Sequence, residues 1–416
     1  MEHTKAINAK QYLILIIILG TLTALSPFSI DMYLPGFPAL AADLHTTTAQ
    51  VSLTLSSFFI GISAGQLLYG PLLDRFGRKP PLYIGLGVYI VASLACVFVR
   101  SIDILIVLRF IQAIGSCSAG VASVVMVRDL FPVNENAKVF SLLMLVLGTS
   151  PMIAPTIGGY VTAAFGWQAV FIILAALAVL IVIAVYFLLP NTYEPDIHMS
   201  LKPGPIINNF LLVIKEPQFY TYALTGAVAF SGLFAYVSGS PMVFMEIFKV
   251  SGKVYGWIFA FLSVGLIGSG QINTLLLRTY KSEQVIYAAL MFQVITGIFF
   301  VVATALGWLG LYSTIATIFL YLCCLGLTNP NTAALSMAPF SKNAGSASAL
   351  MGAMQMGIGS LASVAVSLFS FATPLPLAVI MACTSFTGFL ILMVGRKNVK
   401  NQPANNRKKT INAGLI

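Results

Sequence analysis

The chain has 416 residues, of which 58% are hydrophobic and 8% are charged, whereas about 25% of the residues in a soluble domain carry a charge. So few charges cannot cover a water-facing surface, and the composition therefore excludes a soluble globular domain. The net charge of +10 would suit nucleic acid, but the basic residues lie between apolar runs and form no aromatic, groove-lining patch, so no nucleic-acid partner is expected.

Twelve apolar runs follow one another along the chain, each close to the roughly 20 residues that cross a bilayer as a helix. The first, at 12–42, is much longer than the roughly 7–15-residue core of a secretory signal peptide, so we expect it to be retained. The pattern predicts an all-α integral membrane protein with spans at 11–35, 49–70, 81–99, 104–127, 138–162, 168–189, 218–245, 254–276, 284–306, 309–330, 345–369 and 375–395.

A polar, proline-rich stretch at 191–217 interrupts these runs halfway along the chain and is typical of a linker. The dipeptide Gly65-Gln66, near the end of the second run, recurs as Gly270-Gln271 near the end of the eighth. We therefore expect a six-helix half at 1–190, a cytoplasmic linker at 191–217, a second six-helix half at 218–395 and a basic cytoplasmic tail at 396–416.

The basic residues between the runs predict the orientation. If the N-terminus is cytoplasmic, the outer loops hold only Arg100, Lys249 and Lys253, and the other lysines and arginines outside the spans lie on the cytoplasmic side. Because cytoplasmic loops of membrane proteins are enriched in Lys and Arg, both termini are predicted to be cytoplasmic.

Two ionisable residues lie clearly inside spans, Asp31 in the first and Arg109 in the fourth. Such groups are costly in a bilayer and each requires a role. Both are predicted in the outer half at similar depth, where a direct or water-bridged pair is feasible. We interpret Asp31 as a proton carrier and Arg109, which keeps its proton, as its partner; the alternative is a structural ion pair. Pro27 or Pro35 is expected to break the helix near Asp31, or to leave only a tolerated kink.

The loop after the second span contains one acid, Asp74, and a glycine, Gly77, that permits a tight reversal. A cationic partner at the inner membrane face would hold the cytoplasmic side shut, and Arg128 at the inner end of the fourth span is the candidate. The alternative is that the basic residues of this loop only anchor it on the cytoplasmic side.

The fifth span combines prolines and glycines. Pro151 and Pro155 lie one turn apart and each removes a backbone hydrogen bond, so the helix is expected to bend. Gly148, Gly158 and Gly159 let a neighbouring helix approach closely. The segment is interpreted as a hinge that seals the outer side in one state; the alternative is the ordinary enrichment of Gly and Pro in membrane helices.

These segments resemble signatures of the major facilitator superfamily. The stretch at 70–80 resembles its loop signature, and 108–115 is similar to its R-x-x-Q-G element, with Ala113 where many members have glycine. The stretch at 148–159 resembles the signature of drug:proton antiporters. The stretches at 26–35 and 127–129 are similar to those of the Bcr/CflA efflux branch. The second half departs from the pattern, since its degenerate loop at 278–281 has no acid matching Asp74.

The resemblance implies the major facilitator fold, with twelve helices in two six-helix halves around a central cavity. It implies gating roles for Gly70, Asp74, Arg75, Gly77, Arg78, Arg128, Gly148, Pro151, Pro155, Gly158 and Gly159. The candidate residues that line the cavity and bind substrate are Tyr33, Gln112, Phe230, Phe234, Tyr236, Asn329, Asn331, Met354 and Gln355. Their aromatic and methionine side chains suit varied amphiphilic ligands.

The function predicted is a proton-coupled secondary active exporter of drug-like amphiphiles in a bacterial inner membrane, acting as a monomer. The alternative is a nutrient uptake symporter on the same fold. A receptor leaves Asp31 and Arg109 unexplained, and an enzyme is disfavoured. No nucleotide-binding GxxxxGK[ST] is present, so the proton gradient is the expected energy source and no cofactor is expected. The three histidines lie outside the spans, so no metal site is expected within them.

Overall fold

The structure is a computed structural model that describes residues 9–190, 195, 203–340, 344–369 and 373–400. Within these residues the secondary structure is helical, and twelve helical segments are long and apolar enough to cross a membrane, which confirms the predicted all-α fold and number of spans. The elements are α1 (Ala9–Asp31), η1 (Leu34–Gly36), α2 (Phe37–Asp43), α3 (Thr48–Phe76), α4 (Lys79–Val97), α5 (Ile102–Leu130), α6 (Val133–Phe165), α7 (Gln168–Leu188), α8 (Pro203–Ile214), α9 (Pro217–Pro241), η2 (Met242–Ile247), α10 (Gly252–Leu276), α11 (Ser282–Ala305), α12 (Leu311–Met337), α13 (Ala344–Ser367) and α14 (Leu375–Lys400).

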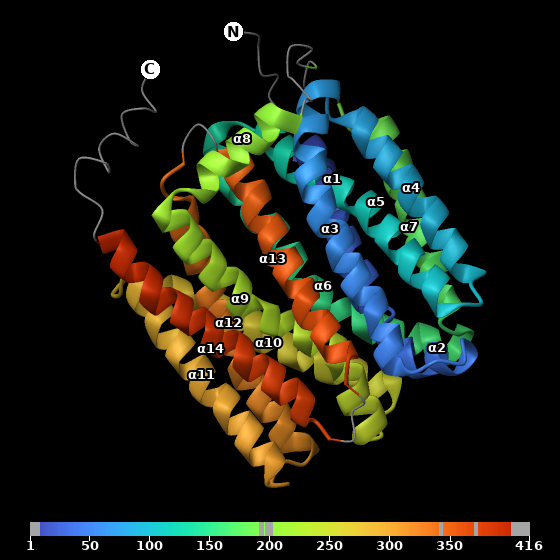
Figure 1. Ribbon diagram of the computed structural model, residues 1–416. Helices are drawn as coiled ribbons and strands as arrows, with labels where there is room; N and C mark the ends of the chain where they lie inside the picture. Colours follow the sequence, from blue (N-terminus) through green and yellow to red (C-terminus); the bar gives the residue numbers. More distant parts are fainter. Residues whose placement is uncertain (1–8, 191–194, 196–202, 341–343, 370–372, 401–416) are drawn as a thin grey trace.

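The helices form one bundle with two distinct ends (Figure 1). On one end α1 begins, α14 ends and α8 lies; we call this end the linker face. On the other end lies α2, and we call it the opposite face. We refer to α1–α7 as the N-terminal half and to α9–α14 as the C-terminal half. The predicted orientation places the linker face in the cytoplasm.

Several element boundaries differ from those predicted. The first span continues beyond residue 35 through η1 and α2 to Asp43, and α14 extends through residues 396–400, which were assigned to the tail. The predicted linker contains a helix, α8. Its two prolines, Pro203 and Pro205, lie in its first turn, where proline removes no intrahelical hydrogen bond, so they do not prevent a helix there. The rest of the predicted tail, 401–416, lies outside the described residues.

Two pairs of helices join the halves: α3 packs against α13, and α6 packs against α10. Across the first pair, the Ser63 hydroxyl donates to the Ala353 carbonyl at 2.8 Å. Nearer the opposite face, the Ser56 and Ser363 hydroxyls share a hydrogen bond of 2.6 Å. These small polar side chains let the helix backbones approach closely and give the approach a fixed register.

The contacts between the halves continue to the opposite face. There the Thr48 hydroxyl donates to the Glu246 carboxylate, which joins the start of α3 to η2. A Cβ atom on Gly252 would lie 3.1 Å from the Pro35 carbonyl oxygen. The Lys253 ammonium lies 5.3 Å from the centroid of the Tyr160 ring. The two halves are therefore held together at this face.

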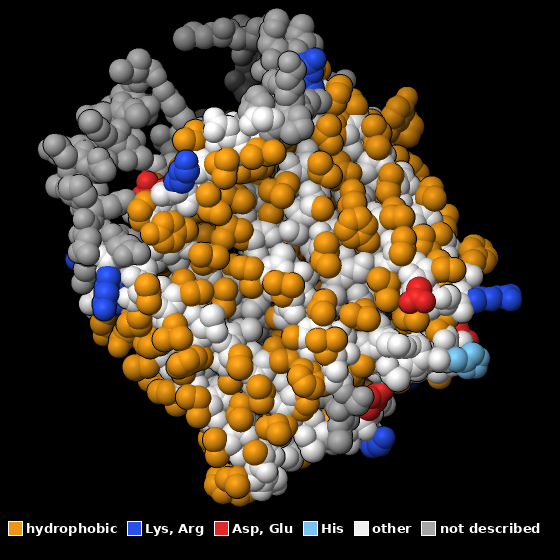
Figure 2. Space-filling model, in the orientation of Figure 1, with side chains coloured by type: hydrophobic (Ala, Val, Ile, Leu, Met, Phe, Trp, Pro, Cys, Tyr) orange, Lys and Arg blue, Asp and Glu red, His pale blue; other side chains and the backbone are white. Residues whose placement is uncertain are grey.

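The surface of the bundle matches a lipid environment. Figure 2 shows hydrophobic side chains over the middle of the molecule, with charged side chains toward the two ends. Large apolar side chains such as Ile84, Val91 and Leu180 are exposed on the spanning helices. Since water would penalise so much exposed apolar surface, these side chains are expected to contact acyl chains.

Candidate functional site

Asp31 is the last residue of α1, at a place where the helix gives way to irregular backbone. Pro35 lies in the short η1 helix that follows, whereas Pro27 is accommodated inside α1. The helix therefore ends next to Asp31, in agreement with the prediction that a proline breaks it there. Its side chain is buried, with Asp31 only 4% exposed.

The surroundings of Asp31 come from both halves. The Met32 carbonyl oxygen faces Gly158 of α6 so closely that a Cβ atom there would overlap it. From the C-terminal half, the hydroxyls of Tyr236 and Tyr255 are within electrostatic range of the Asp31 carboxyl group. Asp31 thus sits where the end of α1 meets α6, α9 and α10.

Asp31 has no ion-pair partner among the described residues. Its two tyrosine neighbours differ in their own hydrogen bonds. The Tyr255 hydroxyl shares a hydrogen bond of 2.8 Å with Ser240, whereas the buried Tyr236 hydroxyl has no partner within the described part of the chain. The carboxyl group therefore lies in an enclosed, weakly polar place that a change of packing between the halves would alter.

Arg109 of α5 is fully buried inside the N-terminal half. Its guanidinium donates to the Ser29 carbonyl at 2.7 Å and to the Gln112 side-chain oxygen at 2.5 Å. The Ser29 carbonyl is among the last four of α1, which have no partner within the helix, so Arg109 caps the negative end of the helix dipole.

Aromatic rings complete the surroundings of Arg109. Its guanidinium carbon lies 4.4 Å from the ring centroid of Tyr33, 4.2 Å from that of Phe58 and 5.7 Å from that of Phe171. These cation–π contacts stabilise a cation that forms no ion pair with a carboxylate in the described part of the chain. Phe58 and Phe171 were not predicted from the sequence, because an aromatic residue in an apolar run carries no signal of its own.

Of the direct or water-bridged Asp31–Arg109 pair that the sequence made feasible, the direct form is not among the ion pairs of the described residues. The predicted depths are similar, but Arg109 reaches α1 at Ser29, two residues before Asp31, and residues two apart are about 200° apart around a helix. Arg109 therefore meets α1 on the side that packs against α5 and α7, whereas Asp31 lies toward the C-terminal half.

The predicted substrate-binding residues fall into two groups. Tyr33 and Gln112 lie inside the N-terminal half, where the Tyr33 hydroxyl shares a hydrogen bond of 2.6 Å with Thr54 and Gln112 donates to Ser93 at 2.7 Å. This placement argues against the expectation that they line a cavity between the halves, because both belong to the set of side chains that holds Arg109.

The second group lies on the C-terminal half. The Phe234 ring meets the Phe59 ring of α3 with centroids 4.6 Å apart, and Phe230 packs against Phe234. Gln355 donates to Asn329 at 3.1 Å, and both are partly exposed.

The remaining two predicted binding residues lie elsewhere in the C-terminal half. Asn331 is buried within this half, where it donates to Asn273 at 2.6 Å. Met354 packs against a small apolar cluster near the linker face.

The gating residues of the linker face form an ion-pair cluster around Arg78. Its guanidinium donates to Asp74 at 2.7 Å and to Asp129 at 2.6 Å. Burial lowers the pKa of Arg78, but the two carboxylates outweigh that effect and hold its pKa above the ordinary value. The prediction that Arg128 pairs with Asp74 is wrong. Arg128 is exposed, and its neighbour Asp129 pairs with Arg78 of the loop.

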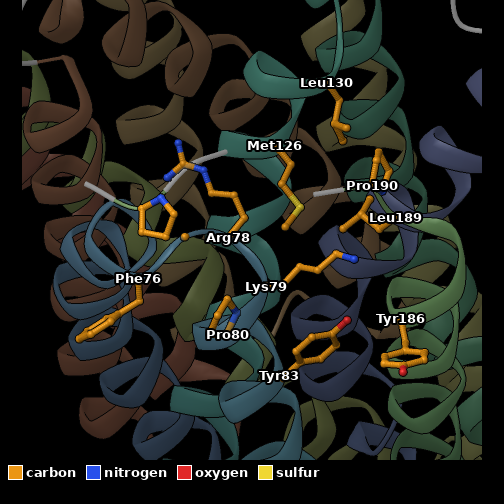
Figure 3. A pocket seen from close by; sticks show the side chains of 12 residues that line it. Phe76, Arg78, Lys79, Pro80, Tyr83, Met126, Leu130, Tyr186, Leu189 and Pro190 are labelled. Carbon is orange, nitrogen blue, oxygen red and sulfur yellow. The ribbon is translucent and has the colours of Figure 1, made fainter. Parts of the chain in front are cut away.

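The turn at Gly77, which has a positive φ of 82°, forms one wall of a cavity of about 540 Å³ (Figure 3). Lys79, Tyr83 and Tyr186 line it together with apolar side chains. The cavity lies in the N-terminal half beside the linker, so it is distinct from a central cavity between the halves. Gly70, which was also predicted to gate, has open space where a Cβ atom would lie.

The glycines and prolines of α6 lie against both α1 and α10. A Cβ atom on Gly159 would lie 2.6 Å from the Gly252 carbonyl oxygen, and the Pro155 carbonyl oxygen lies 2.7 Å from the Cβ position of Gly256. Gly148 is less crowded, with Ile267 at 3.6 Å. Pro151 and Pro155 both lie inside α6, which continues past them.

Comparison with protein-family models matches residues 19–364 to the Major Facilitator Superfamily. A bicyclomycin resistance protein homolog of Haemophilus influenzae is 30% identical over 394 residues, covering 94% of this chain and 99% of the relative. The multidrug resistance protein MdtL of Escherichia coli is 28% identical over 342 residues, covering 80% of this chain and 83% of the relative. The crystal structure of a D-xylose-proton symporter superposes with a TM-score of 0.71 at 15% identity, over 92% of this chain and 97% of that chain.

Proposed function

The chain belongs to the Major Facilitator Superfamily, and from that premise we propose that it is a proton-coupled exporter of drug-like amphiphilic small molecules. It is a membrane transporter and not an enzyme. The observation that carries the proposal is Asp31, a buried carboxyl group that has no counter-ion among the residues the structure describes and lies where the two halves meet. The names of the bicyclomycin and multidrug resistance relatives favour drugs as the cargo.

The proposed mechanism couples protonation of Asp31 to movement of the halves. An ionised carboxyl group with no partner is costly in apolar surroundings, so closure of the opposite face around Asp31 favours its protonated form. Opening toward the outside would let Asp31 take up a proton, and opening toward the linker face would let it release that proton as substrate binds. The energy of the proton gradient then drives export, without a cofactor.

The proposed state of the structure is inward-facing. The contacts between the halves reach the opposite face, through Thr48 with Glu246 and Pro35 with Gly252. With the linker face in the cytoplasm of a bacterial cell, the opposite face is the outer side. The binding surface would lie between the halves, where the partly exposed Phe230, Asn329 and Gln355 supply aromatic and amide groups.

We propose that the protein acts as a monomer. The proposed function is tested by replacing Asp31 with Asn and expressing the protein in a bacterial host that lacks its own efflux pumps. Inside-out vesicles, with the linker face outward and an acidic lumen, are given ethidium or chloramphenicol as a cationic and a neutral probe. We expect the parent to accumulate at least one probe and the Asp31→Asn variant to accumulate neither, with equal amounts of protein in the membrane.

The matched control is Asp103→Asn, since Asp103 is an exposed acid on α5 at the opposite face. It should transport like the parent. Full transport by the Asp31→Asn variant would rule out Asp31 as the essential proton carrier. Movement of proton and substrate in the same direction would identify a symporter instead of an exporter.

A further inference from the structure

Among the side chains of the linker helix α8 that the structure describes, Val213 is the one that is buried. It is fully buried in a cluster with Phe219 and Ala223 of α9 and Ala347 of α13. The helix lies on the linker face, outside the layers of spanning helices (Figure 1). The attachment fixes the direction in which the remaining side chains of α8 point.

Apolar side chains are also exposed on α8, on a side that is turned about 100–160° around the helix from Val213. Ile207, Leu211 and Ile214 are exposed, and their spacing of four and three residues places them on one stripe of the helix. Asn208 and Asn209 are also exposed, and they lie on a different face of the helix from the three apolar residues. An apolar stripe of this kind beside a polar face is typical of a helix that lies in the plane of a membrane surface.

The level of α8 along the bundle agrees with this interpretation. Gly395 of α14 packs against Thr221, which lies four residues, or about 6 Å, along α9 from its first residue, Pro217. The neighbouring Val394 is 64% exposed on a spanning helix, so acyl chains reach this level. Because α8 ends at Ile214, just before α9 begins, the end of its stripe lies near the boundary between acyl chains and headgroups.

Basic residues stand at the same level. Lys215 follows α8 directly and is exposed, and Arg396 and Lys397 follow Gly395 on α14. Cations at this height face the headgroups of the leaflet, and each adds attraction to anionic lipid. The apolar stripe and the basic residues therefore favour the same partner, a lipid surface that contains anionic headgroups.

We propose that the stripe formed by Ile207, Leu211 and Ile214 is buried in the headgroup region of the lipid leaflet at the linker face. In this arrangement α8 is a membrane-surface helix that ties the connection between the halves to the bilayer. The proposal concerns the position of α8 alone, and it holds or fails independently of what the protein transports.

The chain offers a matched pair for the test. Leu211 and Leu212 are adjacent, have the same side chain and are 48% and 54% exposed, but they point about 100° apart around the helix. Each is replaced by Cys in a full-length variant without the five native cysteines and labelled with a nitroxide. The protein is placed in vesicles of one part phosphatidylglycerol to three parts phosphatidylethanolamine.

Oxygen, which concentrates in the acyl region, should relax the label at 211 several times more strongly than a water-soluble nickel complex does, and the label at 212 should show the reverse. Equal exposure of both labels to the nickel complex would overturn the proposal. Shielding of the label at 211 from both reagents would also overturn it, since another protein surface would then cover the stripe. If removal of the cysteines prevents folding, Leu211→Trp and Leu212→Trp in the native background are compared by fluorescence quenching with brominated lipid, where only the first should gain a quenched component.

Discussion

Two buried ionisable groups lie next to the last turn of α1, and their surroundings differ. Arg109 donates two hydrogen bonds and contacts three aromatic rings, all from the N-terminal half. Asp31 forms no ion pair within the described residues and faces side chains of the other half. A charge held within one rigid half keeps its partners when the halves move, whereas a group at the boundary between them does not. From this comparison we propose a structural role for Arg109 and a role in the transport cycle for Asp31.

The largest expected effect concerns Arg109. Arg109→Ala leaves the Ser29 carbonyl and the Gln112 amide without their donor and opens a space between the aromatic rings, so we expect a loss of about 3–5 kcal/mol of stability. Thermal unfolding of the purified protein in detergent measures it. Arg109→Lys should recover part of the loss, and Asp31→Asn should unfold at or above the temperature of the parent. Equal stability of Arg109→Ala and Asp31→Asn would contradict the comparison.

A second prediction changes the contact between the two halves near Asp31. In Gly159→Ala the added methyl group would lie 2.6 Å from the Gly252 carbonyl oxygen of α10, whereas in Gly148→Ala it meets Ile267 of α10 at an ordinary 3.6 Å. Overpacking of this kind typically costs about 1–3 kcal/mol, and here the cost applies only while the opposite face is closed, because the two groups belong to different halves. Gly159→Ala should therefore increase the population of molecules that are open at that face, and Gly148→Ala should not.

The measurement is the distance between spin labels on Ala39 of α2 and Lys249 of the C-terminal half, both exposed near the opposite face. The long-distance population should grow in Gly159→Ala relative to the parent. An unchanged distribution would show that the contact between Gly159 and Gly252 does not control closure of the opposite face.

The properties that the sequence predicts well are those that depend on local composition. Each apolar span is visible because the bilayer demands a long run of apolar residues, and the helix break after Asp31 is visible because proline restricts the backbone. The linker helix α8 escaped prediction because it is short, and its prolines, which are usually breakers, occupy the one turn that tolerates them.

The properties that the sequence predicts badly depend on the direction in which a side chain points around its helix. Counting residues gave Asp31 and Arg109 a common depth, but not the opposite sides of α1 that they contact. The same limit applies to Arg128 and Asp129, adjacent residues of which only the acid faces Arg78. These directions are set by the packing of helices distant in sequence, and no local pattern records them.

The smallest expected effect concerns the two tyrosines whose hydroxyls lie within electrostatic range of Asp31, Tyr236 and Tyr255. Tyr236→Phe keeps the ring that stacks on Phe259 and removes a buried hydroxyl without a partner in the described part of the chain, whereas Tyr255→Phe removes a hydroxyl that is bonded to Ser240. A hydroxyl without a hydrogen-bond partner of its own can orient its dipole toward the ionised carboxyl group of Asp31, and this favours the ionised form. We therefore expect Tyr236→Phe to move the pH dependence of transport toward higher pH by up to about one unit.

Tyr255→Phe is the control. It should leave the pH dependence in place and lower thermal stability slightly, by about 1 kcal/mol, because the Ser240 hydroxyl loses its partner. Initial rates in vesicles between pH 6 and pH 9, roughly the range in which such a shift is visible, separate the two variants. Identical profiles for both variants would mean that Asp31 is insensitive to the hydroxyls facing it, and its protonation would then be controlled by access to water alone.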